Sequence, residues 1–106
     1  LVAYPFDEWE KVEQKILYQT TKDDDLRLFR RFFIGGAFEC FCDRQDRILI
    51  PPPLREYADL NKEIVLAGVV DHFEIWSREN WVNEDARFEQ NRNKPEVKNI
   101  IAGIGL

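Results

Sequence analysis

Residues 43–57 place a polar turn, a short apolar run and three consecutive prolines in an order that few folds accommodate. The segment Asp43-Arg44-Gln45-Asp46 has the composition of a turn, and the residues on either side of it, 37–42 and 47–50, are rich in strand formers. The prolines cannot continue the interior of a sheet, whereas a proline suits the first turn of a helix. The run therefore predicts two strands joined by a tight turn, followed by a short helix over 54–58.

Two helices are expected before this segment, because apolar residues recur at helical spacing over 8–19 and again over 25–34. Three aspartates, at 23–25, lie where the second helix begins and favour its N-terminal dipole, and a pair of glycines follows it as a stop. Its polar face gathers Arg27, Arg30 and Arg31. These arginines form a solvated surface, pair with the aspartates, or belong to a surface that meets another subunit or a phosphate.

A second pair of strands is expected after the prolines, over 63–70 and 73–76, where β-branched and aromatic residues dominate. Ser77 can cap a helix that follows directly, and Pro95 is expected to close it. Residues 97–104 carry apolar side chains at helical spacing, but nearby glycines weaken a helix there, so this tail either docks on a neighbour or is mobile. The predicted fold class is α+β.

The composition fits a single globular domain, and its charge argues against indiscriminate binding to nucleic acid. Hydrophobic residues make up 44% of the 106 residues, and the apolar runs are too short to span a membrane. The net charge of -5 is unevenly distributed. Residues 1–25 carry three basic and seven acidic side chains and contribute -4, and residues 56–106 carry six basic and ten acidic side chains and also contribute -4. Residues 26–55 carry six basic and three acidic side chains and contribute +3. The positive middle block is either a site for an anionic partner or an ordinary fluctuation.

Side chains that could support catalysis or hold a metal are scarce. Cys40 and Cys42 would face one side of a strand, which suits small core residues of a reduced, cytoplasmic protein better than a metal or redox site. His72 is the only histidine and lies in a predicted turn, and no serine or cysteine has a plausible base beside it. We therefore expect no enzyme activity, no cofactor and no metal site.

An internal repeat relates two distant parts of the chain. Residues 1–9 and 73–81 each read as a strand ending on an aromatic residue, a helix start, an acidic position and a tryptophan, at a constant offset of 72. The repeat predicts that the chain opens on the last strand of a first unit, while the second unit, 37 to about 88, is complete. A first unit that lacks its earlier strands leaves strand edges and an apolar face uncovered, so we expect the chain to self-associate.

The turn segment resembles the second barrel half of the MraZ family of bacterial transcriptional regulators, which have a SpoVT/AbrB-type swapped-hairpin barrel. Asp43 and Arg47 supply the family's Asp-x-x-x-Arg pattern. The resemblance extends from residue 1 to about 88 and includes Ile48-Leu49-Ile50-Pro51, Leu54-Arg55-Glu56-Tyr57 and Phe73-Glu74-Ile75-Trp76.

The resemblance implies a barrel half with flanking helices, divided into three parts. Residues 1–36 would be the last strand of a first repeat with its linking helices. Residues 37–93 would be the second SpoVT/AbrB-like repeat with its C-terminal helix, and residues 94–106 a tail.

The implied function is that of a DNA-binding repressor of the bacterial division and cell-wall gene cluster. The resemblance assigns DNA contact to Arg47, with Arg44 and Arg55 as further candidates, because arginine contacts phosphates and guanine edges. Asp43 and Asp46 would hold the turn, and a pair between Asp43 and Arg47 is compatible with DNA contact. Asp46 stands where many relatives have glycine, and its carboxylate would repel phosphate.

The implied partners are promoter DNA with repeated boxes and further copies of the chain, arranged in a ring, with no membrane partner. The implied location is the cytoplasm, in association with the nucleoid. An alternative is an assembly module of such a regulator, with DNA contact mainly in the first repeat. An enzyme with an unrecognised site is the least supported reading.

Overall fold

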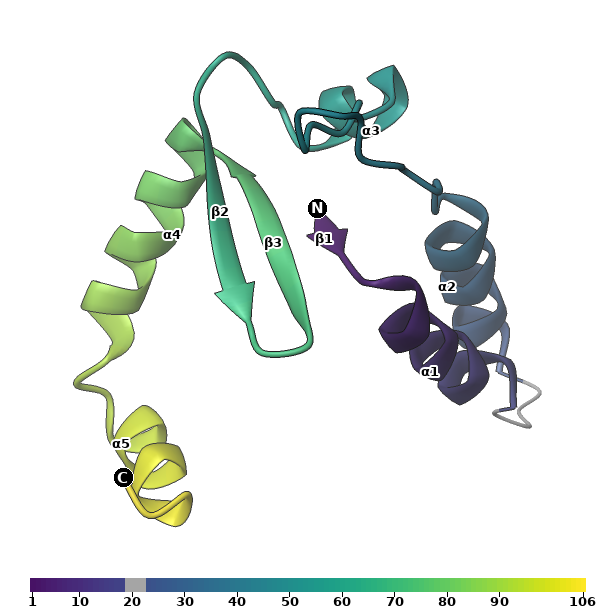
Figure 1. Cartoon of the computed structure of the whole chain (residues 1–106). Coiled ribbons are helices and arrows are strands. Elements are labelled where there is room, and N and C mark those ends of the chain that lie inside the picture. Colours follow the sequence, from purple (N-terminus) through teal and green to yellow (C-terminus); the bar gives the residue numbers. More distant parts are fainter. Residues whose placement is uncertain (19–22) are drawn as a thin grey trace.

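The computed structural model describes residues 1–18 and 23–106, and within them it forms five helices and three strands. In chain order they are β1 (Val2–Ala3), α1 (Phe6–Leu17), α2 (Asp24–Gly35), α3 (Pro52–Tyr57), β2 (Ile64–Val69), β3 (His72–Ser77), α4 (Arg78–Asn91) and α5 (Pro95–Gly103). Figure 1 shows a small sheet between α4 on one side and the α1–α2 pair on the other. This mixture confirms the predicted α+β class.

The sheet is antiparallel with the order β1-β3-β2, so β3 is its central strand. Its central place makes β3 the most buried element, and Ile75 and Ser77 are each only 4% exposed. Strands β2 and β3 pair with each other, which confirms the hairpin expected from the β-prone runs over 63–70 and 73–76. The register runs from Ile64 opposite Ser77 to Val69 opposite His72 in the hairpin, with Val2 opposite Glu74 and Ala3 opposite Phe73 at β1.

Helix α4 follows β3 without a loop and runs alongside the sheet (Figure 1). The Ser77 hydroxyl accepts a hydrogen bond from the backbone N–H of Asn80 at 3.1 Å, which confirms the predicted cap. The rings of Trp76 and Trp81 meet edge to face with centroids 6.0 Å apart, which ties the end of the strand to the first turns of the helix. Helix α4 ends at Asn91, before Pro95. Pro95 is also the first residue of α5.

Helices α1 and α2 pack through aromatic rings on their facing stripes. The Phe33 ring lies 5.6 Å from the Trp9 ring and 5.2 Å from the Phe29 ring, measured between centroids. The aspartates lie at the start of α2 as predicted, and the Asp23 carboxylate also caps the helix by accepting the N–H of Asp25 at 2.9 Å. Helix α1 ends at Leu17; the predicted end at residue 19 lies outside the described residues.

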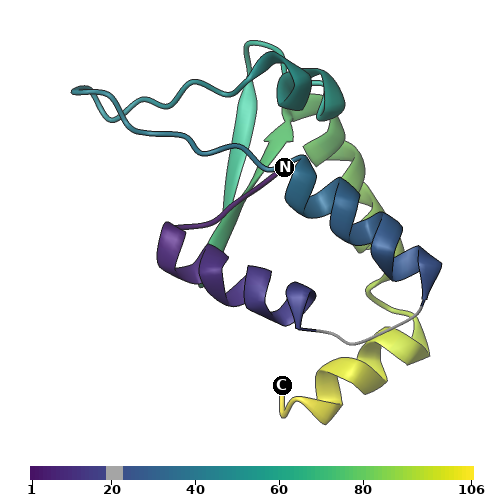
Figure 2. The same cartoon turned by 90° about the vertical axis from the view of Figure 1, so that its right-hand side faces the viewer.

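Residues 37–50, called the arm below, form an extended loop that leaves the body of the molecule (Figure 2). The prediction of paired strands over 37–42 and 47–50 is wrong for the structure of the single chain. Backbone hydrogen bonds between the two sides of the arm occur only at its turn, among residues 43–47. A two-stranded ribbon is marginal alone in water. Neither side of the arm is among the strands of the sheet, and the contact of the Phe41 ring with the Phe6 ring of α1, with centroids 5.8 Å apart, still leaves Phe41 71% exposed.

The chain is more open than its length requires. Its radius of gyration is 16.8 Å, whereas a compact domain of this length has about 13 Å. Large apolar side chains remain exposed on the arm, where Phe41 is 71% and Leu49 78% exposed, and on the edge strand β2, where Leu66 is 62% exposed. Much apolar surface is therefore available for a further partner.

The 72-residue offset reappears in three dimensions. Helix α1 begins at Phe6 and α4 at Arg78, and 78 − 6 is 72. In the antiparallel pair β1–β3, Val2 lies opposite Glu74, which is its own counterpart at the same offset. Two antiparallel strands that meet at equivalent residues are related by a local two-fold rotation through that pair.

The offset also relates an apolar row of α2 to one formed by α5 and its C-cap residue. Leu28, Phe29 and Phe32 correspond to Ile100, Ile101 and Ile104, and all six are at least 36% exposed. The aromatic anchor Phe33, which holds α2 on α1, corresponds to Gly105. The second helix pair therefore lacks the ring contact that closes the first.

Candidate nucleic-acid interface

The tip of the arm is a tight turn closed by its own backbone. The N–H of Asp43 donates to the carbonyl oxygen of Arg47 at 2.8 Å, and the N–H of Asp46 donates to the carbonyl oxygen of Asp43 at 3.1 Å. Asp46 has a φ of 58°, in the left-handed region that aspartate enters more readily than most side chains. Two residues, Arg44 and Gln45, are left at the outermost positions of the turn.

The Asp43 side chain organises the rest of the turn. Its Oδ1 accepts the backbone N–H groups of Gln45 at 2.8 Å and Arg47 at 3.0 Å, and its Oδ2 accepts Nε of Arg47 at 2.9 Å. The bond from the Arg47 N–H, followed by that from Gln45, holds the pKa of Asp43 below the ordinary carboxyl value. The carboxylate therefore fixes both the path of the backbone and the orientation of the arginine.

Arg47 is held at Nε while most of its side chain remains in solvent. It is 71% exposed, so the two terminal nitrogens of the guanidinium can still bind an anion. Arg44 is exposed, and its side chain makes no hydrogen bond or ion pair with the described part of the chain. The turn thus offers one oriented and one free guanidinium at the end of a projecting arm.

Of the predicted site residues, the structure brings Asp43, Arg44, Asp46 and Arg47 together at the tip, whereas Arg55 lies elsewhere. Arg55 is an exposed residue in the last turn of α3, and its carbonyl oxygen accepts the N–H of Leu60 at 2.9 Å. Helix α3 lies near the base of the arm, away from its tip (Figure 2). A duplex contacted by the tip would meet Arg55 only if it also passed over the body.

The arm has an apolar side next to the turn. A hollow of about 350 Å³ is lined by Phe41, Asp43, Arg47, Ile48 and Leu49. The Cys40 thiol lies 3.6 Å from the carbonyl oxygen of Leu49 across the arm, and Cys42 is exposed; both cysteines are free. Within the described ranges, three or more possible metal ligands do not gather at any one place.

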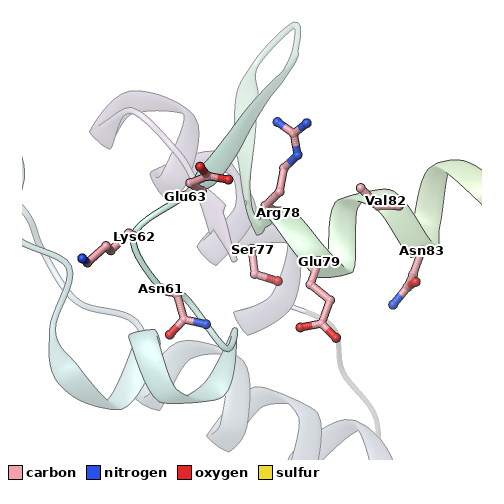
Figure 3. A pocket seen from close by; sticks show the side chains of 8 residues that line it. All are labelled: Asn61, Lys62, Glu63, Ser77, Arg78, Glu79, Val82 and Asn83. Carbon is pink, nitrogen blue, oxygen red and sulfur yellow. The ribbon is translucent and has the colours of Figure 1, made fainter.

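A larger hollow of about 630 Å³ lies elsewhere, where the start of β2 and the end of β3 meet the first turns of α4 (Figure 3). Its charges are mixed, because Lys62 and Arg78 are matched by Glu63 and Glu79, and their ends point in different directions. The buried Ser77 hydroxyl at its floor is already used as the helix cap. These side chains do not converge on a ligand of either charge.

The tip residues were predicted from the sequence, but the part that Gln45 plays in the turn was not. Its N–H is one of the groups that orient the Asp43 carboxylate. The signal was available, because an aspartate at the first position of a turn commonly accepts the N–H two residues on. The larger hollow had no sequence signal, since residues from 61 to 83 form it only once the hairpin has folded.

Known proteins resemble the chain along its whole length. The family described as "MraZ protein, putative antitoxin-like" matches residues 33–100. A "Transcriptional regulator MraZ" of Desulforapulum autotrophicum is 55% identical over 106 residues, which is all of this chain and 71% of that protein. Proteins of the same name from Desulfosudis oleivorans and Pelotomaculum thermopropionicum are 48% and 52% identical over the whole chain, which covers 73% of each.

Among the described residues, no helix is both long and apolar enough to cross a bilayer. The family match covers the arm, its turn and most of the elements that follow, and the relatives extend the likeness to the first helices. The Asp-x-x-x-Arg turn thus lies within the matched region. The chain belongs to the MraZ family.

Proposed function

We propose that this chain is a DNA-binding transcriptional regulator and that it contacts DNA with the tip of the arm. The observation that carries the proposal is the turn itself, in which Asp43 orients Arg47 while leaving most of that side chain in solvent. Arg44 adds a second exposed guanidinium beside it. The relatives' printed name, transcriptional regulator, agrees with this assignment. Asp43 and Asp46 are structural residues of the turn, and Arg55 is a secondary contact at most.

The finer proposal is that the protein is a repressor of the bacterial division and cell-wall gene cluster, including its own promoter. The support is the family membership, and the proposed location is the cytoplasm, in association with the nucleoid. Proposed units are residues 1–36 as the end of a first repeat with linking helices, 37–93 as a second repeat and 94–106 as a tail. The common start of α1 and α4 at the 72-residue offset supports this division.

We further propose that two copies complete a swapped-hairpin barrel. The arm is extended but unpaired along its sides, and β2 is an edge strand with exposed apolar residues. An arm from one copy that pairs with an edge strand of another would satisfy both sets of backbone groups and cover both apolar faces. Self-association of this kind also accounts for a radius of gyration above that of a compact domain.

Several tips acting together would suit a protein of net charge -5. A single tip makes few phosphate contacts, so its affinity for one DNA box is expected to be low. Linked copies in a ring raise the effective concentration of the second and later contacts, which favours promoters with repeated boxes. The proposed partners are therefore such DNA and further copies of the chain.

The second candidate is an assembly module that leaves DNA contact to another part of the protein. It is favoured by the charge of the arm, in which Arg44 and Arg47 are outnumbered by Glu39, Asp43 and Asp46, so that 2 − 3 gives -1. A surface of this charge attracts phosphate weakly. On this alternative the arm serves only to join copies.

Light scattering after size exclusion separates the two candidates. The chain would be run alone and with promoter duplexes that carry repeated boxes, at low and high salt. We expect a multimer that shifts with DNA at low salt and releases it as salt rises. A multimer that ignores every duplex supports the assembly module, and a compact monomer contradicts the barrel proposal.

A further inference from the structure

Gln45 is at the outermost part of the arm, and no interaction within the described residues accounts for its side chain. Its backbone N–H is held by Asp43 Oδ1 at 2.8 Å, so the position of the residue is fixed by the turn. Its side chain is exposed, and no hydrogen bond of that carboxamide is found within residues 1–18 and 23–106. A side chain whose backbone position is fixed and whose polar atoms are unused is suited to recognise a ligand by hydrogen bonds.

The shape of the arm selects which part of a duplex the tip can reach. The major groove of B-DNA, about 12 Å wide, admits a two-stranded ribbon, whereas the minor groove is about half as wide. The arm consists of two extended segments joined by the tight turn of residues 43–47, and it projects from the body (Figure 2). Entry into the major groove, tip first, brings Arg44 and Gln45 closest to the base edges.

The chemistry of the two outermost side chains differs. A guanidinium binds either phosphates or guanine, but a neutral carboxamide gains little from a phosphate. It offers a donor and an acceptor side by side, which match N7 and the N6 amino group of adenine. We propose that Gln45 is a specificity-determining residue that reads an adenine in the major groove; this rests on the proposed DNA-binding function of the arm.

The test compares Gln45→Ala with the unchanged protein on duplexes that the latter selects from a randomised pool. We expect one adenine in the selected site to lose its preference over the other bases by about 5- to 100-fold in the variant. Replacing that adenine by 7-deazaadenine removes N7, and should weaken the unchanged protein while leaving Gln45→Ala unaffected. Gln90→Ala, an exposed glutamine on α4, is the matched control and should retain the preference.

A Gln45→Ala variant with unaltered base preference would overturn the assignment, and so would one that binds all duplexes equally less well, because that result indicates a structural role. If the unchanged protein binds no duplex at all, the proposed function fails together with this inference. If Arg47→Ala abolishes binding while Gln45→Ala changes nothing, only the inference fails.

Discussion

The arm and the β2–β3 hairpin have similar sequence signatures but different structures. Both were predicted as two strands joined by a tight turn, yet only β2 and β3 form a ladder, while the backbone hydrogen bonds across the arm lie at its tip. The difference lies in their neighbours, since β3 has β1 on one edge and α4 packed beside it. A strand pattern therefore predicts an extended backbone, but pairing also requires a third element that buries one face.

The turns of the two hairpins differ as well, although each contains a residue with positive φ. Asp46 has a φ of 58° and Val70 a φ of 56°. Aspartate tolerates this conformation, whereas a β-branched valine is strained in it. The arm thus has a relaxed turn and no ladder, whereas the sheet hairpin has a full ladder that holds a strained turn in place.

The largest expected effect is on the sheet side of this comparison. Ile75→Ala removes the most buried apolar side chain of β3, which is 4% exposed, and should lower the free energy of unfolding by about 2–5 kcal/mol. Chemical denaturation at fixed protein concentration measures it. A loss below about 0.5 kcal/mol would mean that β3 is not the centre of the core.

The arm should show the opposite behaviour, with a small effect on folding and a large one on binding. Asp43→Ala removes the acceptor of two backbone N–H groups and of Arg47 Nε, so the tip loses its fixed geometry. We expect DNA affinity to fall at least about tenfold, the equivalent of one charged hydrogen bond, with the unfolding midpoint nearly unchanged. Asp85→Ala on α4 is the matched control, and equal losses of affinity in both variants would refute the role of the turn.

Replacing the strained valine should stabilise the sheet hairpin. Val70 is fully exposed, so Val70→Asn sacrifices little apolar burial and places a residue that accepts positive φ. The expected gain in the free energy of unfolding is about 1 kcal/mol. The same denaturation experiment measures it, and a loss of stability would show that the side chain of Val70 has a packing role.

The smallest expected effect is a pH dependence confined to the arm. The pKa of Asp43 is lowered in the folded turn, so its stabilising contribution is complete above the ordinary carboxyl pKa of about 3.9 and is lost as pH falls through the lowered value. Amide resonances of Gln45 and Arg47 should therefore shift together below about pH 4. Equal shifts in Asp43→Ala would assign the transition to another group.

Much of this architecture could be predicted from the sequence, because the signals were local. Ser77 caps α4, Pro52 and Pro53 lie in the first turn of α3, and the tip residues share one turn because they are neighbours in the chain. Long-range facts were less accessible. The pairing of β1 with β3 was not predicted, although the repeat identified both as strands, and the isolation of Arg55 from the tip depends on how the arm leaves the body.

The error over the arm has a physical cause. Its residues prefer extended conformations, but a ladder forms only when burial offsets the entropy of ordering two segments. The single chain supplies little such burial along the arm, where Phe41 touches the Phe6 ring of α1 yet remains exposed, as does Leu49. The composition of a segment indicates whether its backbone prefers to be extended. It does not indicate whether another element is available to bury one face of that segment.

The most direct test of DNA contact by the tip is to reverse two positive charges there and to compare the result with the reversal of two positive charges elsewhere on the surface. Arg44→Glu with Arg47→Glu alters the tip, while Arg87→Glu with Arg92→Glu makes the same change on exposed arginines at α4 and its C-terminal cap. Fluorescence anisotropy on a selected duplex should show loss of binding for the tip variant only, with both variants keeping the oligomeric state of the unchanged protein. Equal affinity of the two variants for DNA would contradict the account.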